Sequence, residues 1–202
     1  MHPVVREPRI ESFEILELRP TQITYGAYQV AKRRKHWKKV KEAEEFLGRH
    51  LIPVVHGYKE RYYIIDHHHL SRALYEEGVK KVGVTILADL TKLSKDDFWY
   101  VMDHKAWVHP FAFGKRLAYD DLPKSVDKLE DDPFRSLAGE LRHAGGFSKE
   151  TAPYSEFLWG NFLRGRLKRK EIEADFEGAL REALVLAKGP EADYLPGWCG
   201  PC

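Results

Sequence analysis

The spacing of apolar and polar residues predicts strands and helices that alternate along the first half of the chain. Alternating or continuous apolar runs bounded by turn-forming residues are typical of strands, and three- and four-residue spacing is typical of amphipathic helices. The four strand-like runs cover residues 13–18, 52–57, 61–66 and 81–90. The two helical runs cover residues 27–47 and 71–77. The predicted order is β-α-β-β-α-β, and the two central strands are close enough in sequence to form a hairpin.

The second half of the chain is predicted to be mostly helical. Ser94 precedes a run with Asp96 and Asp97 in its first turn, which is a typical N-terminal capping pattern. Asp132 and Pro133 mark a second helix start, because Asp caps well and Pro fits the first helical position. This pattern leaves the neighbouring Asp131 unexplained. This second helix is expected over residues 134–144, and two more are expected over residues 155–167 and 170–187.

These elements together predict an α/β (α+β) fold. A chain of 202 residues with 43% hydrophobic content is long enough to bury a sizeable core. We expect a small mixed-sheet domain over residues 11–90, a mainly helical part packed on it over residues 91–197, and a tail over residues 198–202.

Composition narrows the class of protein. With 33 basic and 31 acidic residues, the net charge gives no general signal for nucleic-acid binding, although a local basic face remains open. The two cysteines, Cys199 and Cys202, form a C-terminal Cys-x-x-Cys with no helix after it, so a frayed tail is favoured over a redox site. No apolar run has the length of a membrane span or the form of a signal peptide. We therefore expect a cytoplasmic protein without a membrane partner.

The segment "YYIIDHHHLSRALYEEG" holds the strongest candidate for a functional site. If the strand ends near Ile65 and the helix begins near His69 or Leu70, the N–H groups of His69, Leu70 and Ser71 lie in the first turn. They then lack intrahelical acceptors and attract an anion. Imidazoles beside them can donate to phosphate oxygens, and Asp66 can bind Mg²⁺ or accept a proton. The structural alternative is that Asp66 caps the helix and the histidines pack under loops. A zinc site is disfavoured because adjacent side chains rarely converge on one ion.

Five blocks of the sequence resemble the ParB-like nuclease family, a branch of the ParB and sulfiredoxin superfamily. The blocks are "LRPTQITYG", "YYIIDHHHLSRAL", "DDPFRSL", "GGFSK" and "PYSEFLWGNFLR", and the resemblance extends from Leu18 to about Gly197. It implies a small α/β domain whose strand-to-helix turn binds phosphate. Members of the superfamily include ParB proteins that bind and hydrolyse CTP, sulfiredoxins that use ATP, and kinases that phosphorylate free serine.

The turn of this chain departs from the motifs of those relatives. The serine kinases carry Asp-Gly-His-His-Arg, whereas this chain has His67 in place of the glycine and Leu70 in place of the arginine. No cysteine occurs at the turn, which argues against sulfiredoxin chemistry.

The resemblance and the turn together predict a protein that binds a nucleoside triphosphate or another phosphate group with Mg²⁺ and transfers or hydrolyses a phosphoryl group. Asp66 is expected to act as base or metal ligand, and His68 and His69 are expected to stabilise phosphate charge. The further expected phosphate or nucleotide contacts are Thr21, Gln22, His67, Ser71, Arg72 and Lys149.

Two alternatives remain open. In the first, the protein is a nuclease whose basic helix holds a nucleic-acid strand through Lys38, Lys39 and Lys41. In the second, the protein binds a nucleotide or DNA without catalysis.

Overall fold

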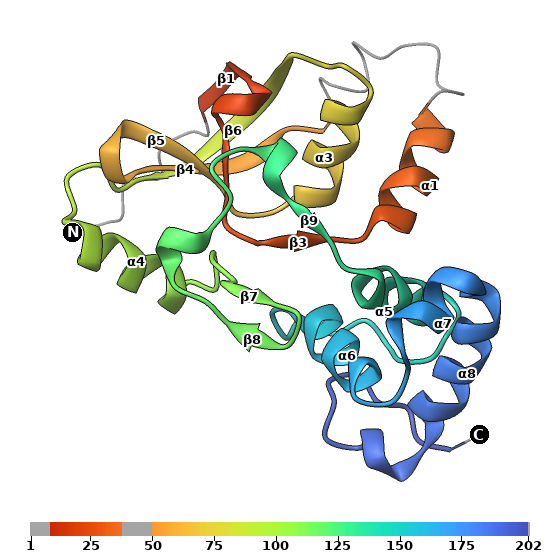
Figure 1. Ribbon diagram of the computed structural model, residues 1–202. Helices are drawn as coiled ribbons and strands as arrows, with labels where there is room; N and C mark the ends of the chain where they lie inside the picture. The colour runs from red at the N-terminus through yellow and green to blue at the C-terminus, as the bar shows by residue number, and fades with distance from the viewer. Residues whose placement is uncertain (1–8, 38–49, 202) are drawn as a thin grey trace. The chain divides into compact units, whose positions relative to one another are not determined.

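The computed structural model describes residues 9–37 and 50–201, which form two compact units (Figure 1). The units are interleaved along the chain, and segments on both sides of Leu90 belong to the first one. The first unit contains Met1–Ile23, Lys32–Pro110 and Leu117–Leu129, and the second contains Thr24–Ala31, Phe111–Arg116 and Glu130–Cys202. No helix among the described residues is long and apolar enough to cross a membrane.

A curled, mixed five-stranded sheet forms the centre of the first unit and confirms the predicted fold class. Its strands are β1 (Arg9–Glu14), β2 (Arg19–Pro20), β4 (Ile52–Gly57), β5 (Arg61–Ile64) and β6 (Lys81–Asp89). The spatial order is β1-β6-β4-β5-β2. The pairs β1–β6 and β4–β5 are antiparallel, whereas β6–β4 and β5–β2 are parallel. The predicted hairpin is therefore the β4–β5 pair.

The first strand lies earlier in the chain than predicted. β1 ends at Glu14, and a 3-10 helix, η1 (Ile15–Glu17), follows it. Ile15 and Leu18 are both buried, and a separation of three residues brings two side chains to the same side of a helical turn but not of a strand. The alternation of apolar and acidic residues therefore belonged to a tight turn.

Two helices accompany this sheet, α3 (His68–Glu76) beside its strands and α4 (Lys95–His104) beside the β4–β5 hairpin (Figure 1). α3 begins earlier than the expected position near His69 or Leu70. In α4, the predicted cap is confirmed, because Ser94 Oγ accepts a hydrogen bond from Asp97 N–H. Three short 3-10 helices complete the unit: η2 (Tyr58–Glu60), η3 (Tyr119–Asp121) and η4 (Val126–Lys128).

A close approach between β4 and α4 requires the glycine at position 57. The Phe98 ring is fully buried and packs on Tyr63, with ring centroids 4.7 Å apart. A Cβ atom at position 57 would lie far inside van der Waals contact with the Phe98 ring. Gly57 thus lets α4 lie directly against the hairpin.

The second unit is mainly helical. It contains α5 (Pro133–His143), α6 (Ser155–Arg164), α7 (Arg169–Ala174), α8 (Phe176–Lys188) and the 3-10 helix η5 (Pro190–Ala192). Short strand pairs join β3 (Thr24–Tyr25) to β9 (Glu130–Asp131) and β7 (Phe111–Ala112) to β8 (Lys115–Arg116). Trp159 lies fully buried at the centre, stacked on Phe147 at 4.5 Å.

The helix predicted over residues 170–187 is two helices. Asp175 separates α7 from α8, and its side chain accepts a hydrogen bond from Gly178 N–H as the N-cap of α8. An aspartate can continue a helical pattern or cap a new helix, so apolar spacing alone does not reveal the break.

The helix α1 (Ala27–Trp37) is capped by residues from far along the chain. Asp131 Oδ1 accepts a hydrogen bond from Ala27 N–H at 2.8 Å, and Ser136 Oγ accepts one from Tyr28 N–H at 3.2 Å. These bonds satisfy donors that have no acceptor within the helix. They also give Asp131 the role that the sequence left unexplained.

Candidate functional site

The turn after β5 holds two exposed residues and one buried histidine. β5 ends at Ile64, and α3 begins at His68 with His67 as its N-cap residue. His67 has left-handed backbone geometry, with φ 62° and ψ 26°, and its side chain makes no capping hydrogen bond. Asp66 and His67 are exposed. The exposed part of the turn is therefore the Asp66–His67 pair.

The ring of His67 is oriented by the backbone. His67 Nδ1 lies 3.2 Å from the carbonyl oxygen of Leu51, which only accepts hydrogen bonds, so Nδ1 carries the proton. In the neutral ring, Nε2 then keeps a lone pair that can accept a proton or bind a metal ion. Asp66 Oδ1 accepts a hydrogen bond from His67 N–H at 2.6 Å. This contact holds the carboxylate close to the start of the helix.

His68 is buried, and its ring is tied to the segment after β2. Thr21 N–H donates to His68 Nε2 at 3.1 Å, so the ring is the neutral tautomer with its proton on Nδ1. Thr21 Oγ1 in turn donates to the carbonyl oxygen of Ile64 at 2.6 Å. Thr21 and His68 therefore connect the ends of two neighbouring strands to α3. The buried position of His68 agrees with the alternative in which the histidines pack under loops. The predicted contact of His68 with phosphate stays a prediction.

Ser71 closes the first turn of α3. Its N–H donates to the carbonyl oxygen of His67 at 2.8 Å, and its Oγ donates to the same oxygen at 3.0 Å. We expected the Ser71 N–H to lack an acceptor, but the earlier start of the helix supplies one. First-turn donors toward an anion therefore come from residues that precede Ser71.

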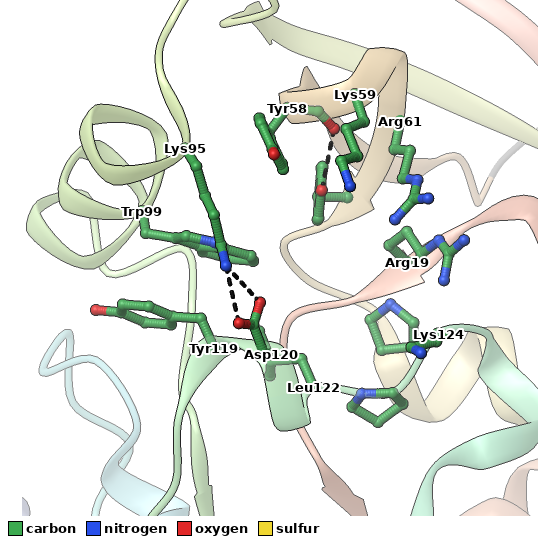
Figure 2. A pocket seen from close by; sticks show the side chains of 13 residues that line it. Arg19, Tyr58, Lys59, Arg61, Lys95, Trp99, Tyr119, Asp120, Leu122 and Lys124 are labelled. Atoms are coloured by element: carbon green, nitrogen blue, oxygen red, sulfur yellow. Dashed lines mark hydrogen bonds and ion pairs between the residues drawn. The ribbon is translucent and has the colours of Figure 1, made fainter.

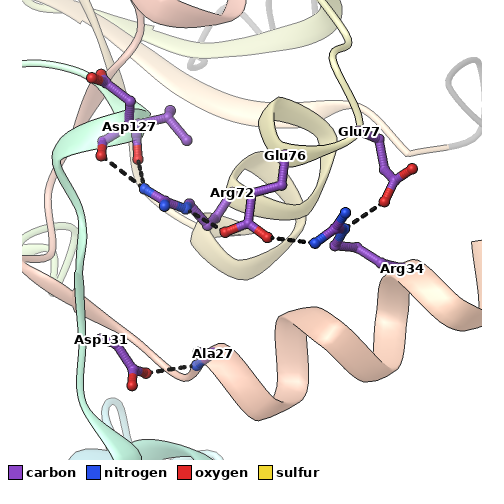
Figure 3. Close-up of polar contacts among 8 residues, drawn as sticks. Ala27, Arg34, Arg72, Glu76, Glu77, Asp127 and Asp131 are labelled. Atoms are coloured by element: carbon purple, nitrogen blue, oxygen red, sulfur yellow. Dashed lines mark hydrogen bonds and ion pairs between the residues drawn. The ribbon is translucent and has the colours of Figure 1, made fainter.

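Arg72 belongs to a network within the first unit (Figure 3). Its Nε lies 2.8 Å from Glu76 Oε1, and its Nη1 donates to the carbonyl oxygens of Asp127 and Val126 at 2.8 and 3.3 Å. Glu76 also pairs with Arg34 at 2.9 Å. Arg34 contacts Glu77 as well, and this hydrogen bond raises the pKa of the Arg34 guanidinium. Arg72 thus holds α3 to the 126–127 segment, and its predicted contact with phosphate stays a prediction.

The other predicted contacts are spread over the chain. Gln22 forms an isolated bridge with His109, and His69 lies partly exposed in the first turn of α3. Lys149 is an exposed residue of the second unit. Lys38, Lys39 and Lys41 lie outside the described residues. Sequence reasoning missed Leu51 as a partner of His67, because a backbone carbonyl has no signature in residue type.

A metal ion would find few protein ligands at the turn. No group of three or more His, Cys, Asp or Glu residues that could hold a metal ion occurs in the described parts of the chain. Asp66 and His67 remain as one carboxylate and one oriented imidazole. This set suits a cation that is mainly coordinated by water and by the phosphates of a ligand, as Mg²⁺ commonly is.

Comparison with known proteins gives the family of the chain. The family model described as "Putative ParB-like nuclease" matches residues 11–165. Among solved structures, the chain is similar to protein Atu1540 from Agrobacterium tumefaciens, with 50% sequence identity and a TM-score of 0.90. That alignment covers 97% of this chain and 99% of the other. No curated protein matches the chain. Because the family model covers well over half of the sequence, the chain belongs to the ParB-like nuclease family.

Proposed function

We propose that the Asp66–His69 turn binds the phosphates of a nucleoside triphosphate together with Mg²⁺, and that the protein hydrolyses the nucleotide or transfers its phosphoryl group. The observation that carries this proposal is the exposed Asp66–His67 pair at the start of α3, with an imidazole that Leu51 orients. Family membership agrees with a phosphate substrate, since the family is described in terms of nuclease action.

The start of α3 supplies positive potential. A helix N-terminus carries partial positive charge on N–H groups that have no acceptor within the helix, and it therefore favours phosphate oxygens. The side chain of His67 does not cap this end, so a ligand can approach it. His67 and His69 add ring N–H donors when protonated. Together these groups stabilise the charge that develops on a transferred phosphoryl group.

Asp66 is the base or the metal ligand of the proposed reaction. As a base it accepts the proton of the attacking water or hydroxyl group. As a ligand it holds Mg²⁺, which supplies charge neutralisation on the phosphates, while water and phosphate oxygens complete the coordination. His68 positions the turn through its bond with Thr21.

The test is turnover of ATP and CTP with Mg²⁺ by the full chain, compared with the Asp66→Asn variant. We expect Asp66→Asn to abolish phosphate release and to leave thermal unfolding unchanged, because Asp66 is exposed. Asp193→Asn, an exposed aspartate of the second unit, is the matched control and should keep full activity. Equal turnover in wild type and Asp66→Asn would refute the assignment.

The family description favours a second candidate, cleavage of nucleic acid at the same turn. In that case the attacked group is a phosphodiester, and Lys38, Lys39 and Lys41 hold the strand. Mg²⁺-dependent cutting of single-stranded DNA, lost in Asp66→Asn and weakened steeply by salt, would favour this candidate. Saturable nucleotide binding without turnover or cutting would favour a non-catalytic role.

A further inference from the structure

A cavity of about 140 Å³ lies within the first unit, beside β2 and the start of β5 (Figure 2). Four segments that are distant in sequence contribute charged side chains to it, and we call it the basic pocket. Its charged lining residues are Arg19, Lys59, Arg61, Lys95, Lys124 and Asp120. Five cations thus face one carboxylate, although the whole chain is nearly neutral. The excess charge is a product of the fold and is not visible in composition.

The single carboxylate is already engaged. Lys95 Nζ lies 2.8 Å from both oxygens of Asp120, and this pairing lowers the pKa of Asp120 and raises the pKa of Lys95. Within the described part of the chain, neither Arg19 nor Arg61 forms an ion pair with a carboxylate. The two arginines therefore contribute uncompensated positive charge.

The sheet holds these two arginines together. Arg19 is in register with Tyr63 across the parallel β2–β5 pair, and Arg61 precedes Tyr63 by two residues, so their side chains leave the same face. Figure 2 shows the two guanidinium groups side by side. Burial lowers the pKa of Arg19, and the neighbouring charge of Arg61 lowers it further. A bound anion would relieve this repulsion, and paired guanidinium groups match phosphate oxygens well.

The hairpin turn keeps a lysine at the pocket in a costly conformation. Lys59 has φ 59° and Glu60 has φ 53°, both in the left-handed region that favours glycine. The turn is braced by a hydrogen bond from Tyr63 Oη to the carbonyl oxygen of Tyr58 at 3.1 Å. Lys59 Nζ lies 5.4 Å from the centre of the Tyr58 ring. A lysine held in a strained backbone conformation at a charged pocket supports a ligand-binding role.

A second cavity, of about 420 Å³, shares four lining residues with the basic pocket. The shared residues are Lys95, Trp99, Tyr119 and Asp120. Trp99 and Tyr119 are stacked, with ring centroids 4.8 Å apart, and Asp96 and Asp103 also line this cavity. It therefore combines aromatic surface with carboxylates, which repel phosphate and accept hydrogen bonds from N–H groups. The Lys95–Asp120 pair between the two cavities is exposed, so it can rearrange at small cost.

We propose that the basic pocket binds the phosphate group of a phosphomonoester whose organic part is a planar ring with N–H donors, lying in the neighbouring cavity. The volume fits this division, because 140 Å³ is well below the roughly 300–1,000 Å³ of pockets that enclose a whole organic ligand. The site is separate from the Asp66–His69 turn, and it requires neither Mg²⁺ nor Asp66.

The experiment is calorimetric titration of the full chain in Mg²⁺-free buffer with adenosine 5′-monophosphate, ribose 5-phosphate and inorganic phosphate. We expect adenosine 5′-monophosphate to bind more tightly than the other two probes, because it alone fills both cavities. Arg61→Gln should weaken its binding about tenfold or more, since it removes charge-assisted hydrogen bonds to phosphate. Arg61 is exposed, so this variant should fold. The matched control Arg181→Gln, at an exposed position of α8, should bind as the wild type does.

Three results would overturn the proposal. Absence of saturable binding by the wild type would remove the site altogether. Equal affinity for all three probes would contradict the placement of a ring in the second cavity. Loss of binding in Asp66→Asn, with Arg61→Gln unaffected, would assign the ligand to the turn. The test of the Asp66–His69 turn measures turnover of a nucleoside triphosphate with Mg²⁺, whereas this titration measures binding without Mg²⁺. A negative result for the turn therefore does not contradict the basic pocket, and a negative result for the pocket does not contradict the turn.

Discussion

Replacement of Arg72 by alanine distinguishes a structural role, in which Arg72 holds α3 to residues 126–127, from its predicted contact with phosphate. The Arg72 side chain is 16% exposed and contacts Glu76 and the carbonyl oxygens of Val126 and Asp127. A net hydrogen bond contributes about 1 kcal/mol, and an i,i+4 ion pair about 0.3–0.5 kcal/mol. Glu76 keeps Arg34 as a partner in the variant, so no charge is left unpaired. We therefore expect Arg72→Ala to lower the free energy of unfolding by about 2 kcal/mol.

Urea unfolding at neutral pH measures this loss, and nucleotide titration of the same variant measures any effect on binding. Arg72→Lys should recover about half of the stability, because lysine keeps the charge but lacks the planar fork that reaches two carbonyl groups. Arg181→Ala, on an exposed helix face, should change stability by less than about 0.5 kcal/mol. If Arg72→Ala is as stable as Arg181→Ala but binds nucleotide more weakly, Arg72 has no structural role and instead contacts the ligand at the turn.

Other positions give independent tests. Gly57→Ala should destabilise the chain by about 1–3 kcal/mol in thermal or urea unfolding, because the new Cβ meets the Phe98 ring, and Phe98→Leu in the same chain should recover part of the loss. Asp131→Ala should cost about 1 kcal/mol through loss of the cap on Ala27, whereas Asp131→Asn keeps an acceptor and should cost less than half of that. Burial raises the pKa of Asp131, so the folded state holds a proton there at pH values where the unfolded chain has released it. The wild type should therefore gain stability relative to Asp131→Asn as the pH falls from 7 toward about 4, and a constant difference would contradict the raised pKa.

The elements that the sequence predicted best are those whose signals are local. The strand over residues 52–57 was confirmed to the residue, because a short β-rich run bounded by Gly57 needs no distant information. The start of α5 was confirmed by Asp132 and Pro133, which act on their own helix. The position of β1 was predicted wrongly from the alternation of apolar and acidic residues. Its position is decided by pairing with β6, which lies about 70 positions later in the chain.

The site was harder to predict because its partners are remote in sequence. The end of the strand was predicted to within one residue and the start of the helix to within three, but burial of His68 depends on Thr21, 47 positions earlier. The engagement of Arg72 depends on carbonyl groups 54 and 55 positions later, and no residue type announces a carbonyl acceptor. Arg19 and Arg61 are unremarkable on their own, and only the β2–β5 register brings them to one face.

The capping of α1 has a consequence for the order in which the protein folds. The two bonds that hold the start of this helix span 104 and 108 residues of chain, so neither can form during synthesis until more than half of the polypeptide has emerged. Contacts of such long sequence separation form late, because the loop between them must close first. The first turn of α1 should therefore gain protection from hydrogen exchange only after α5 has folded, and a nascent chain that stops before Glu130 should leave that turn frayed.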